Sequence, residues 1–157
     1  MPNGRGATPS SISTSRSEDK IGVCRETPLR DVDDRFVQEL RHVLLDLHKS
    51  LLDAQRIRYE REHGRVASSQ AFLGLVLEHP TFAWLRSMSA LIARLDEWME
   101  EEDRPPEGLS SIVSALRSLI EADGKIASFS TPYWQIVNDV PEVLVSHVKL
   151  WRFLDKR

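Results

Sequence analysis

The sequence of 157 residues contains a single cysteine, Cys24, and its formal net charge is only −3. One cysteine can form neither an intrachain disulfide nor a cysteine-rich zinc site, so we expect a protein of the reducing cytoplasm. Proteins that bind nucleic acids usually carry a surplus of Lys and Arg that neutralises phosphates. Because this chain has no such surplus, we expect no nucleic-acid partner.

Long apolar segments are also absent. No apolar run approaches the roughly 20 residues that cross a bilayer, and the N-terminus lacks the apolar core of a secretory signal. We therefore expect neither export nor a membrane partner.

The sequence motifs of enzyme active sites are missing too. No serine lies in a nucleophile elbow, no glycine-rich loop is suited to phosphate, and Cys24 lies in a polar N-terminal segment. These absences argue against an enzyme, and we expect no bound cofactor.

No stretch alternates polar and apolar residues as a half-buried strand does. The eight prolines lie in the N-terminal segment, in breaks between apolar segments or at helix starts. The sequence therefore predicts an all-α protein. Four long helices with short connections favour an up-and-down four-helix bundle with one or two additional short helices, as a single domain over residues 29–157.

Residues 1–28 are rich in Ser, Thr, Gly and Pro and contain few apolar side chains. So little apolar surface does not offset the entropy lost on ordering the chain, which predicts a disordered tail. Such a tail can be a docking segment, can be modified at a serine, or can be a leader without a role, including one created by a start codon assigned too far upstream.

The chain is organised around one strongly amphipathic segment, residues 81–102. At about 100° per residue its large apolar side chains form one stripe, which predicts a helix with one face in the core. The stripe contains Trp84, Leu85, Met88, Leu91, Ile92, Leu95, Trp98 and Met99. Small side chains form an outer face that lets another helix approach closely: Ala83, Ser87, Ala90 and Ala93.

A first long helix is predicted over residues 31–63. It ends where Gly64 offers a left-handed cap. Its start has two alternatives: a cap at Asp31, or a cap at Thr27 that places Pro28 in the first turn.

Two later helices are predicted over residues 109–124 and 141–154. Asp139 and Glu142 have the spacing of a capping box before the second of these.

Two short helices complete the pattern. Residues 71–78 follow a cap at Ser68, stop before Pro80 and are apolar on nearly every side, which predicts a buried plug. Residues 133–138 follow a Thr-Pro pair and are expected to begin with Pro132 in the first turn.

Residues 47–98 contain a series of short motifs in a fixed order. They are Tyr59-Glu60-Arg61, the Gly64 break, Phe72-Leu73, Leu77, Pro80, Phe82-Ala83-Trp84-Leu85-Arg86, Leu91-Ile92 and Asp96-Glu97. This segment resembles a pattern in small uncharacterised bacterial all-helical proteins. The resemblance implies a bacterial cytoplasmic bundle, and it transfers no activity and no functional residue.

Helical bundles can hold di-iron, haem and other metal sites in their cores, so the histidines are candidate ligands. Glu60 and His63 lie on one helix face with the spacing of a di-iron ligand pair, although no second pair accompanies them. A metal- or cofactor-binding bundle that uses His147 with His48, or Glu60 with His63, is therefore the alternative function.

His147 lies in the middle of the last helix's apolar stripe. It is either a hydrogen-bonded core histidine or a ligand or proton-transfer group in a pocket. Its candidate neighbours are Tyr59, Asp96 and Tyr133. The four tryptophans, Trp84, Trp98, Trp134 and Trp151, are expected to pack in the core rather than to form a ligand box.

Acidic residues gather at the C-terminal end of the segment 81–102, where the helix dipole disfavours anions. They are Asp96, Glu97, Glu100, Glu101, Glu102 and Asp103, and in an up-and-down bundle they share a pole with Lys149, Arg152, Lys156 and Arg157. The pattern predicts a solvated face, mutual neutralisation, or a docking site for a basic partner.

The absence of a catalytic motif and the small-residue face together favour a non-enzymatic protein-interaction or regulatory module. Its expected partner is itself, as a homodimer, or another protein.

Overall fold

The computed structural model describes residues 28–121 and 127–156, with side chains from Asp34 onward. All regular secondary structure in these residues is helical, which confirms the all-α prediction. The predicted tail lies outside the described residues apart from Pro28, which begins the first helix.

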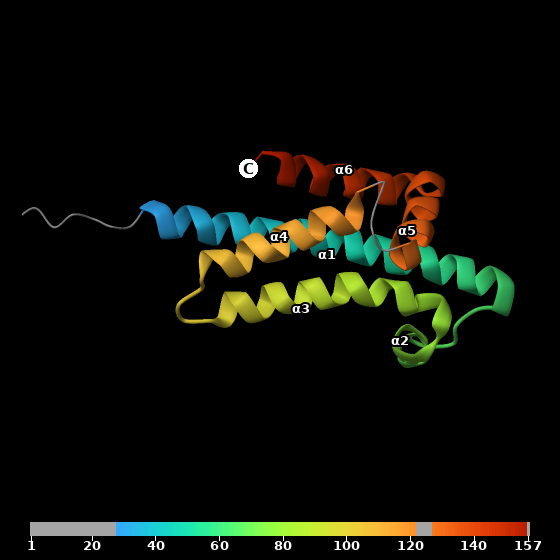
Figure 1. Cartoon of the computed structure of the whole chain (residues 1–157). Coiled ribbons are helices and arrows are strands. Elements are labelled where there is room, and N and C mark those ends of the chain that lie inside the picture. The colour runs from blue at the N-terminus through green and yellow to red at the C-terminus, as the bar shows by residue number, and fades with distance from the viewer. Residues whose placement is uncertain (1–27, 122–126, 157) are drawn as a thin grey trace, which may run out of the picture.

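Six α-helices and one 3-10 helix follow one another along the described chain (Figure 1). They are α1 (Pro28–His63), α2 (Ser69–Glu78), the 3-10 helix η1 (Pro80–Leu85), α3 (Arg86–Glu100), α4 (Pro106–Ile120), α5 (Ala127–Asp139) and α6 (Pro141–Asp155). In Figure 1, α1, α3, α4 and α6 lie along one another and each runs opposite to the one before it, while α2 and α5 lie toward one end. None of the helices in the described part of the chain combines the length and apolar character that crossing a bilayer requires.

The helix α1 is the central helix of the core, because it packs against both α3 and α6. Its apolar side chains are buried at Val37, Leu40, Leu44, Leu47, Leu51 and Ala54. The predicted end is also confirmed: Gly64 has φ +85°, and its N–H donates to the carbonyl of Glu60 over 3.0 Å. Pro28 lies in the first turn, as one of the two predicted starts required.

The segment predicted as one helix over residues 81–102 is divided into η1 and α3. Pro80 begins the tighter helix, and the side chain of His79 accepts a hydrogen bond from the N–H of Thr81. Residues three apart lie on one face of a 3-10 helix, which explains why Phe82 and Leu85 are both buried. The predicted orientation of α3 is confirmed, since Met88, Leu91, Leu95 and Trp98 are buried and Ala90, Ala93 and Arg94 are exposed.

The prediction that residues 71–78 form a buried plug is wrong. No residue of α2 is buried, and Leu73 and Leu77 are 56% and 62% exposed. The helix packs on the molecule through one side: the Phe72 ring meets Phe82 at 5.7 Å between centroids. The side that carries Leu73 and Leu77 faces solvent.

One predicted helix start near the C-terminus is wrong, and for the last helix the predicted start at Pro141 is confirmed but its predicted capping box is not. The helix α5 begins at Ala127, so Pro132 lies inside it instead of in its first turn. An earlier start lets Phe129 bury its ring against Tyr133, with 5.1 Å between the ring centroids. Before α6, the N-cap residue is Val140, which has no side-chain cap. The carboxylate of Asp139 instead pairs with Arg58 at 2.5 Å, so the predicted capping box does not form.

The helix predicted over residues 109–124 is α4, which begins earlier, at Pro106, and ends at Ile120. Its predicted last residue lies outside the described residues.

Candidate functional site

The predicted interaction residues of the central segment lie together on its outer face. Ala90 and Ala93 are exposed, and Ala83 and Ser87 are half-buried beside them. Three exposed charged residues lie on this side of α3: Arg86 before the alanines, and Arg94 and Glu97 after them. The guanidinium of Arg94 donates to the hydroxyl of Ser111 on α4 over 3.4 Å, so Arg86 and Glu97 bracket the alanines. We call the six residues Ala83, Arg86, Ser87, Ala90, Ala93 and Glu97 the α3 outer face.

The exposed helix α2 adjoins one end of the α3 outer face. The guanidinium of Arg86 donates to the carbonyl oxygen of Leu77 over 2.7 Å. Leu77 itself is 62% exposed, so an apolar surface begins where the alanine surface ends. The two surfaces are joined by a direct hydrogen bond.

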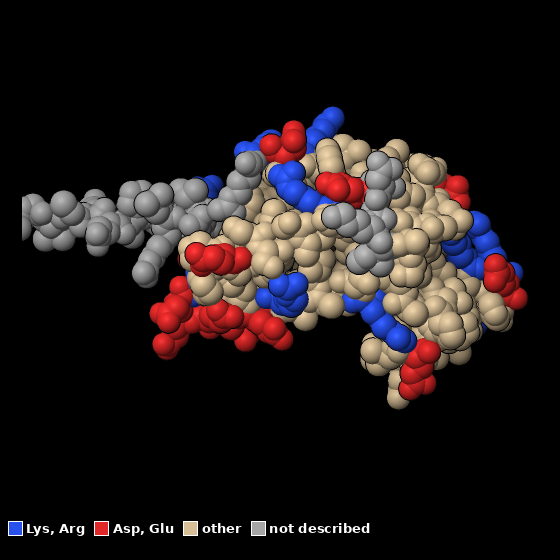
Figure 2. Space-filling view, in the orientation of Figure 1, with Lys and Arg blue, Asp and Glu red and all other residues tan. Residues whose placement is uncertain are grey.

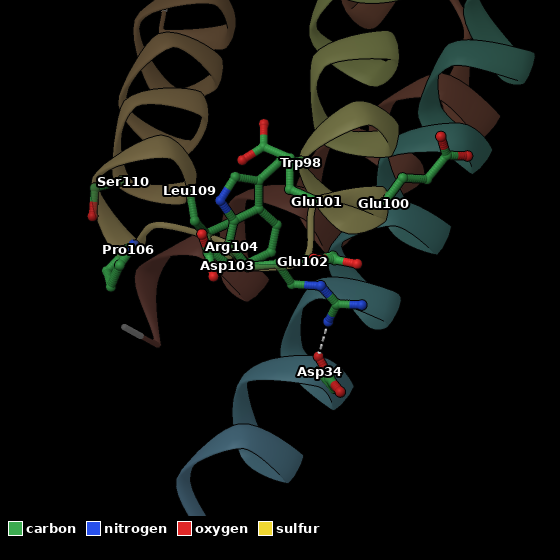
Figure 3. A pocket seen from close by; sticks show the side chains of 10 residues that line it. All are labelled: Asp34, Trp98, Glu100, Glu101, Glu102, Asp103, Arg104, Pro106, Leu109 and Ser110. Carbon is green, nitrogen blue, oxygen red and sulfur yellow. Dashed lines mark hydrogen bonds and ion pairs between the residues drawn. The ribbon is translucent and has the colours of Figure 1, made fainter.

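The acidic cluster lies at the other end of α3 and is visible as a group of red atoms at the lower left of Figure 2. Glu100 and Glu101 belong to it and line a cavity of about 610 Å³ between the end of α3, the start of α4 and α1. Figure 3 shows Arg104 reaching from the α3–α4 loop to Asp34 of α1, with which it forms an ion pair. Trp98 closes the cavity on the inside, and its indole N–H donates to the carbonyl of Pro105 over 2.9 Å.

The mutual neutralisation predicted between this cluster and the end of α6 is not formed by ion pairs. Among the described residues, none joins these carboxylates to Lys149, Arg152 or Lys156, and Arg157 lies outside them. A closer cation pairs with one carboxylate of the cluster, Asp96. The guanidinium of Arg41 on α1 contacts Asp96 at 2.6 Å, and Arg104 takes Asp34, so Glu100 and Glu101 are left in solvent.

His147 is the buried histidine of α6, with 8% of its surface exposed. Its Nδ1 atom lies 2.6 Å from the hydroxyl of Tyr133 on α5. Burial lowers the pKa of His147 and raises that of Tyr133, so both are neutral near pH 7. The hydroxyl is therefore the donor: were Nδ1–H the donor, the buried phenol proton would have no acceptor among the described residues.

His48 does not lie beside His147. Its Nε2 atom lies 3.0 Å from the hydroxyl of Ser89, so it faces α3, whereas His147 faces α5. Burial also lowers the pKa of His48.

Glu60 and His63 lie near the C-terminal end of α1, and both make contacts with residues around that end. Glu60 accepts hydrogen bonds from the N–H of Val66 and from Arg56, and these lower its pKa. The His63 ring stacks on Tyr59 with 4.3 Å between ring centroids, and its Nδ1 atom lies 3.2 Å from the Tyr59 carbonyl. In the described part of the chain, no three His, Cys, Asp or Glu side chains form a group suited to a metal ion.

The sequence does not predict the aromatic cluster around His147 as a site. Trp134 and Trp151 are expected in core packing, yet both contact the His147 ring, and Trp151 is 38% exposed. A signal is present in the sequence, since His147 and Trp151 are four residues apart and share a helix face. The partner from α5 cannot be inferred from spacing.

No family model matches the chain, and neither a curated protein nor a solved structure matches it.

Proposed function

We propose that this chain is a protein-interaction module, built as an up-and-down four-helix bundle, that pairs with a second copy of itself through the α3 outer face. The alternating directions of α1, α3, α4 and α6 in Figure 1 support the bundle assignment. The observation that carries the proposed pairing is the order of charges and small side chains along α3.

That order is self-complementary. Arg86 lies four residues before Ala90, and Glu97 lies four residues after Ala93. A two-fold axis between the alanines therefore places Arg86 of each copy opposite Glu97 of the other in an antiparallel pair. A parallel pair would place like charges opposite one another, so the charges favour the antiparallel arrangement.

The small side chains supply the steric part of the argument. Ala90 and Ala93 are exposed and project little from the helix, so a second helix can approach until its backbone is close. The neighbouring helix α2 adds apolar area, because Leu73 and Leu77 are more than half exposed. Burying apolar surface contributes about 25 cal/mol per Å², which favours association once the two surfaces fit.

A charge-swap experiment tests the pairing. We expect light scattering at high micromolar concentration to show a dimer for the wild-type chain. Arg86→Glu or Glu97→Arg each places like charges opposite one another twice per dimer, and we expect the dissociation constant to rise about tenfold or more. The double variant Arg86→Glu/Glu97→Arg restores both contacts and should recover most of the affinity.

The matched control is Glu142→Arg, which makes the same charge change at an exposed position in the first turn of α6. Its dissociation constant should equal that of the wild type. A wild-type monomer at high micromolar concentration contradicts the proposal, and so does a double variant that stays as weak as the single ones.

A further inference from the structure

A small cavity opens where the end of α4 meets α5 and α6. Its volume is about 190 Å³, and it is lined by Ile120, Glu121, Trp134, His147 and Trp151. It lies on other elements than the α3 outer face, so a ligand in this cavity does not require the proposed pairing.

Aromatic rings form most of the cavity wall. The Trp134 ring crosses the His147 ring at 67° with 5.0 Å between centroids, while the Trp151 ring lies within 21° of parallel to it at 6.4 Å. The two indoles are therefore steeply inclined to one another, and each contacts the imidazole. The Tyr133 hydroxyl holds the imidazole in place, and the indole N–H of Trp134 donates to the carbonyl of Glu121 over 3.3 Å.

The electrostatic environment of the cavity favours a cation. The faces of aromatic rings carry negative partial charge, and Glu121 places an exposed carboxyl group at the rim. Glu121 is also the C-cap of α4, the helix end that carries the negative pole of the dipole. Among the described residues, no Lys or Arg lines the cavity, and burial keeps His147 neutral near pH 7 by lowering its pKa.

We propose that this cavity binds a methylated ammonium group, such as the headgroup of choline or the side chain of trimethyllysine. A cation of this kind is bulky, weakly hydrated and without hydrogen-bond donors, so aromatic faces are its natural partners. The volume supports a headgroup rather than a larger ligand, because cavities for drug-sized molecules and cofactors measure about 300–1,000 Å³.

The test compares choline with its neutral isostere, 3,3-dimethylbutan-1-ol, by calorimetric titration of the full chain. The two probes have the same shape and differ only in charge. If the aromatic faces and Glu121 recognise the cation, choline binds about 2- to 30-fold more tightly than the isostere. If the isostere binds as tightly as choline, the proposal is overturned.

Two variants connect the binding to this cavity. Trp151→Ala removes one aromatic wall at a partly exposed position and should weaken choline binding about 2- to 30-fold, whereas Trp151→Phe keeps a ring and should lose less. Glu121→Gln removes the rim charge and should weaken choline binding without changing isostere binding. Val145→Ala is the control on the same helix, because Val145 is 55% exposed and does not line the cavity. Wild-type affinity in both Trp151→Ala and Glu121→Gln overturns the assignment even if a variant melts earlier.

The source of the headgroup is distinguished by three probes of the same chemistry. Free choline, a trimethyllysine peptide beside its unmethylated form, and phosphatidylcholine vesicles beside phosphatidylglycerol vesicles are titrated against wild type and Trp151→Ala. The probe with the highest affinity that depends on Trp151 identifies the source. If none of the three binds in a Trp151-dependent way, the proposal is wrong.

Discussion

The contact between Tyr133 and His147 shows how a buried polar pair can be accommodated in an apolar core. Each ring is almost fully removed from solvent, and the hydrogen bond of 2.6 Å satisfies the phenol proton and one imidazole nitrogen together. Had either residue been alone, its polar atom would have cost about 1–3 kcal/mol. Tyr133 was one of three predicted neighbours of His147, whereas Tyr59 contacts His63 and Asp96 pairs with Arg41.

The same pair predicts how stability depends on pH. Burial lowers the folded-state pKa of His147 below its unfolded value of about 6.5. The unfolded chain therefore binds a proton more readily, and stability present above about pH 6.5 is lost as the pH falls below it. We expect urea melts to show lower stability at about pH 5.5 than at about pH 7.5.

A variant comparison isolates His147 from other titrating groups. His147→Phe removes the ring nitrogens that bind the proton, so the loss of stability between the two pH values should be smaller. The Tyr133 hydroxyl then lacks its hydrogen-bond partner, which lowers stability at both pH values. The control is Val145→Phe at an exposed position of the same helix, which removes no titrating group and should leave the loss unchanged. If His147→Phe loses as much stability between the two pH values as the wild type does, other groups cause the pH dependence.

At the scale of elements, periodicity predicted long helices well and short ones poorly. The stripe of α3 repeats over four turns and has one interpretation, a helix with one face in the core. The short helix α2 is apolar on nearly every side, and this pattern predicts only that each side is covered by other protein atoms. Whether this chain or a partner covers the second side depends on the packing of distant elements, which local spacing does not encode.

The predicted capping box before α6 does not form for a related reason, although the predicted cap at Ser68 does form. The spacing of Asp139 and Glu142 is correct for a capping box, but Arg58 competes for the Asp139 carboxylate from 81 residues away in the chain. The Asp139 carboxylate is the acceptor in either contact, but the guanidinium adds an opposite full charge that the local N–H group lacks, so the long-range partner prevails. In contrast, Gly64 caps α1 as predicted because its positive φ is a property of the backbone itself.

The buried stripe of α3 carries a prediction about stability. Leu95 is fully buried and Arg94, its neighbour in the chain, is exposed on the opposite side. Leu95→Ala should lower the free energy of unfolding by about 2–5 kcal/mol, because it removes transfer energy and leaves a cavity. Arg94→Ala should change it by no more than about 0.5 kcal/mol.

Urea melts at two protein concentrations separate folding from association in this comparison. Equal, small effects for both variants would mean that α3 is oriented wrongly. A large loss for Arg94→Ala that depends on protein concentration would place the interface on the α3 outer face, because Arg94 lies one turn after Ala90 on that side of α3.

At the scale of the whole molecule, the helical class was predictable and the assignment of partners to charges was not. Composition and periodicity suffice for the helical class, although α5 has 13 residues where a short helix over residues 133–138 was predicted. At the acidic end of α3, Asp96 pairs with Arg41 of α1, which no periodicity linked to it, and among the described residues no ion pair joins the cluster to the cations of α6. The aromatic cavity has the same origin, because its walls come from the end of α4, α5 and α6, and only folding brings these segments together.

The two proposed surfaces lie on different elements, and this leads to a prediction about coupling. The α3 outer face belongs to η1 and α3, while the aromatic cavity belongs to α4, α5 and α6, and no residue is shared. Both surfaces consist of side chains on packed helices, so neither ligand needs a second conformation of the other surface. Choline at saturation should therefore leave the dimer dissociation constant unchanged.

By thermodynamic reciprocity, Glu97→Arg should bind choline with wild-type affinity even where it no longer dimerises. Sedimentation with and without choline, beside calorimetry of Glu97→Arg, measures both halves of the cycle. A shift of fivefold or more in either half, roughly 1 kcal/mol of coupling, would mean that α4 and α5 transmit a change from one surface to the other.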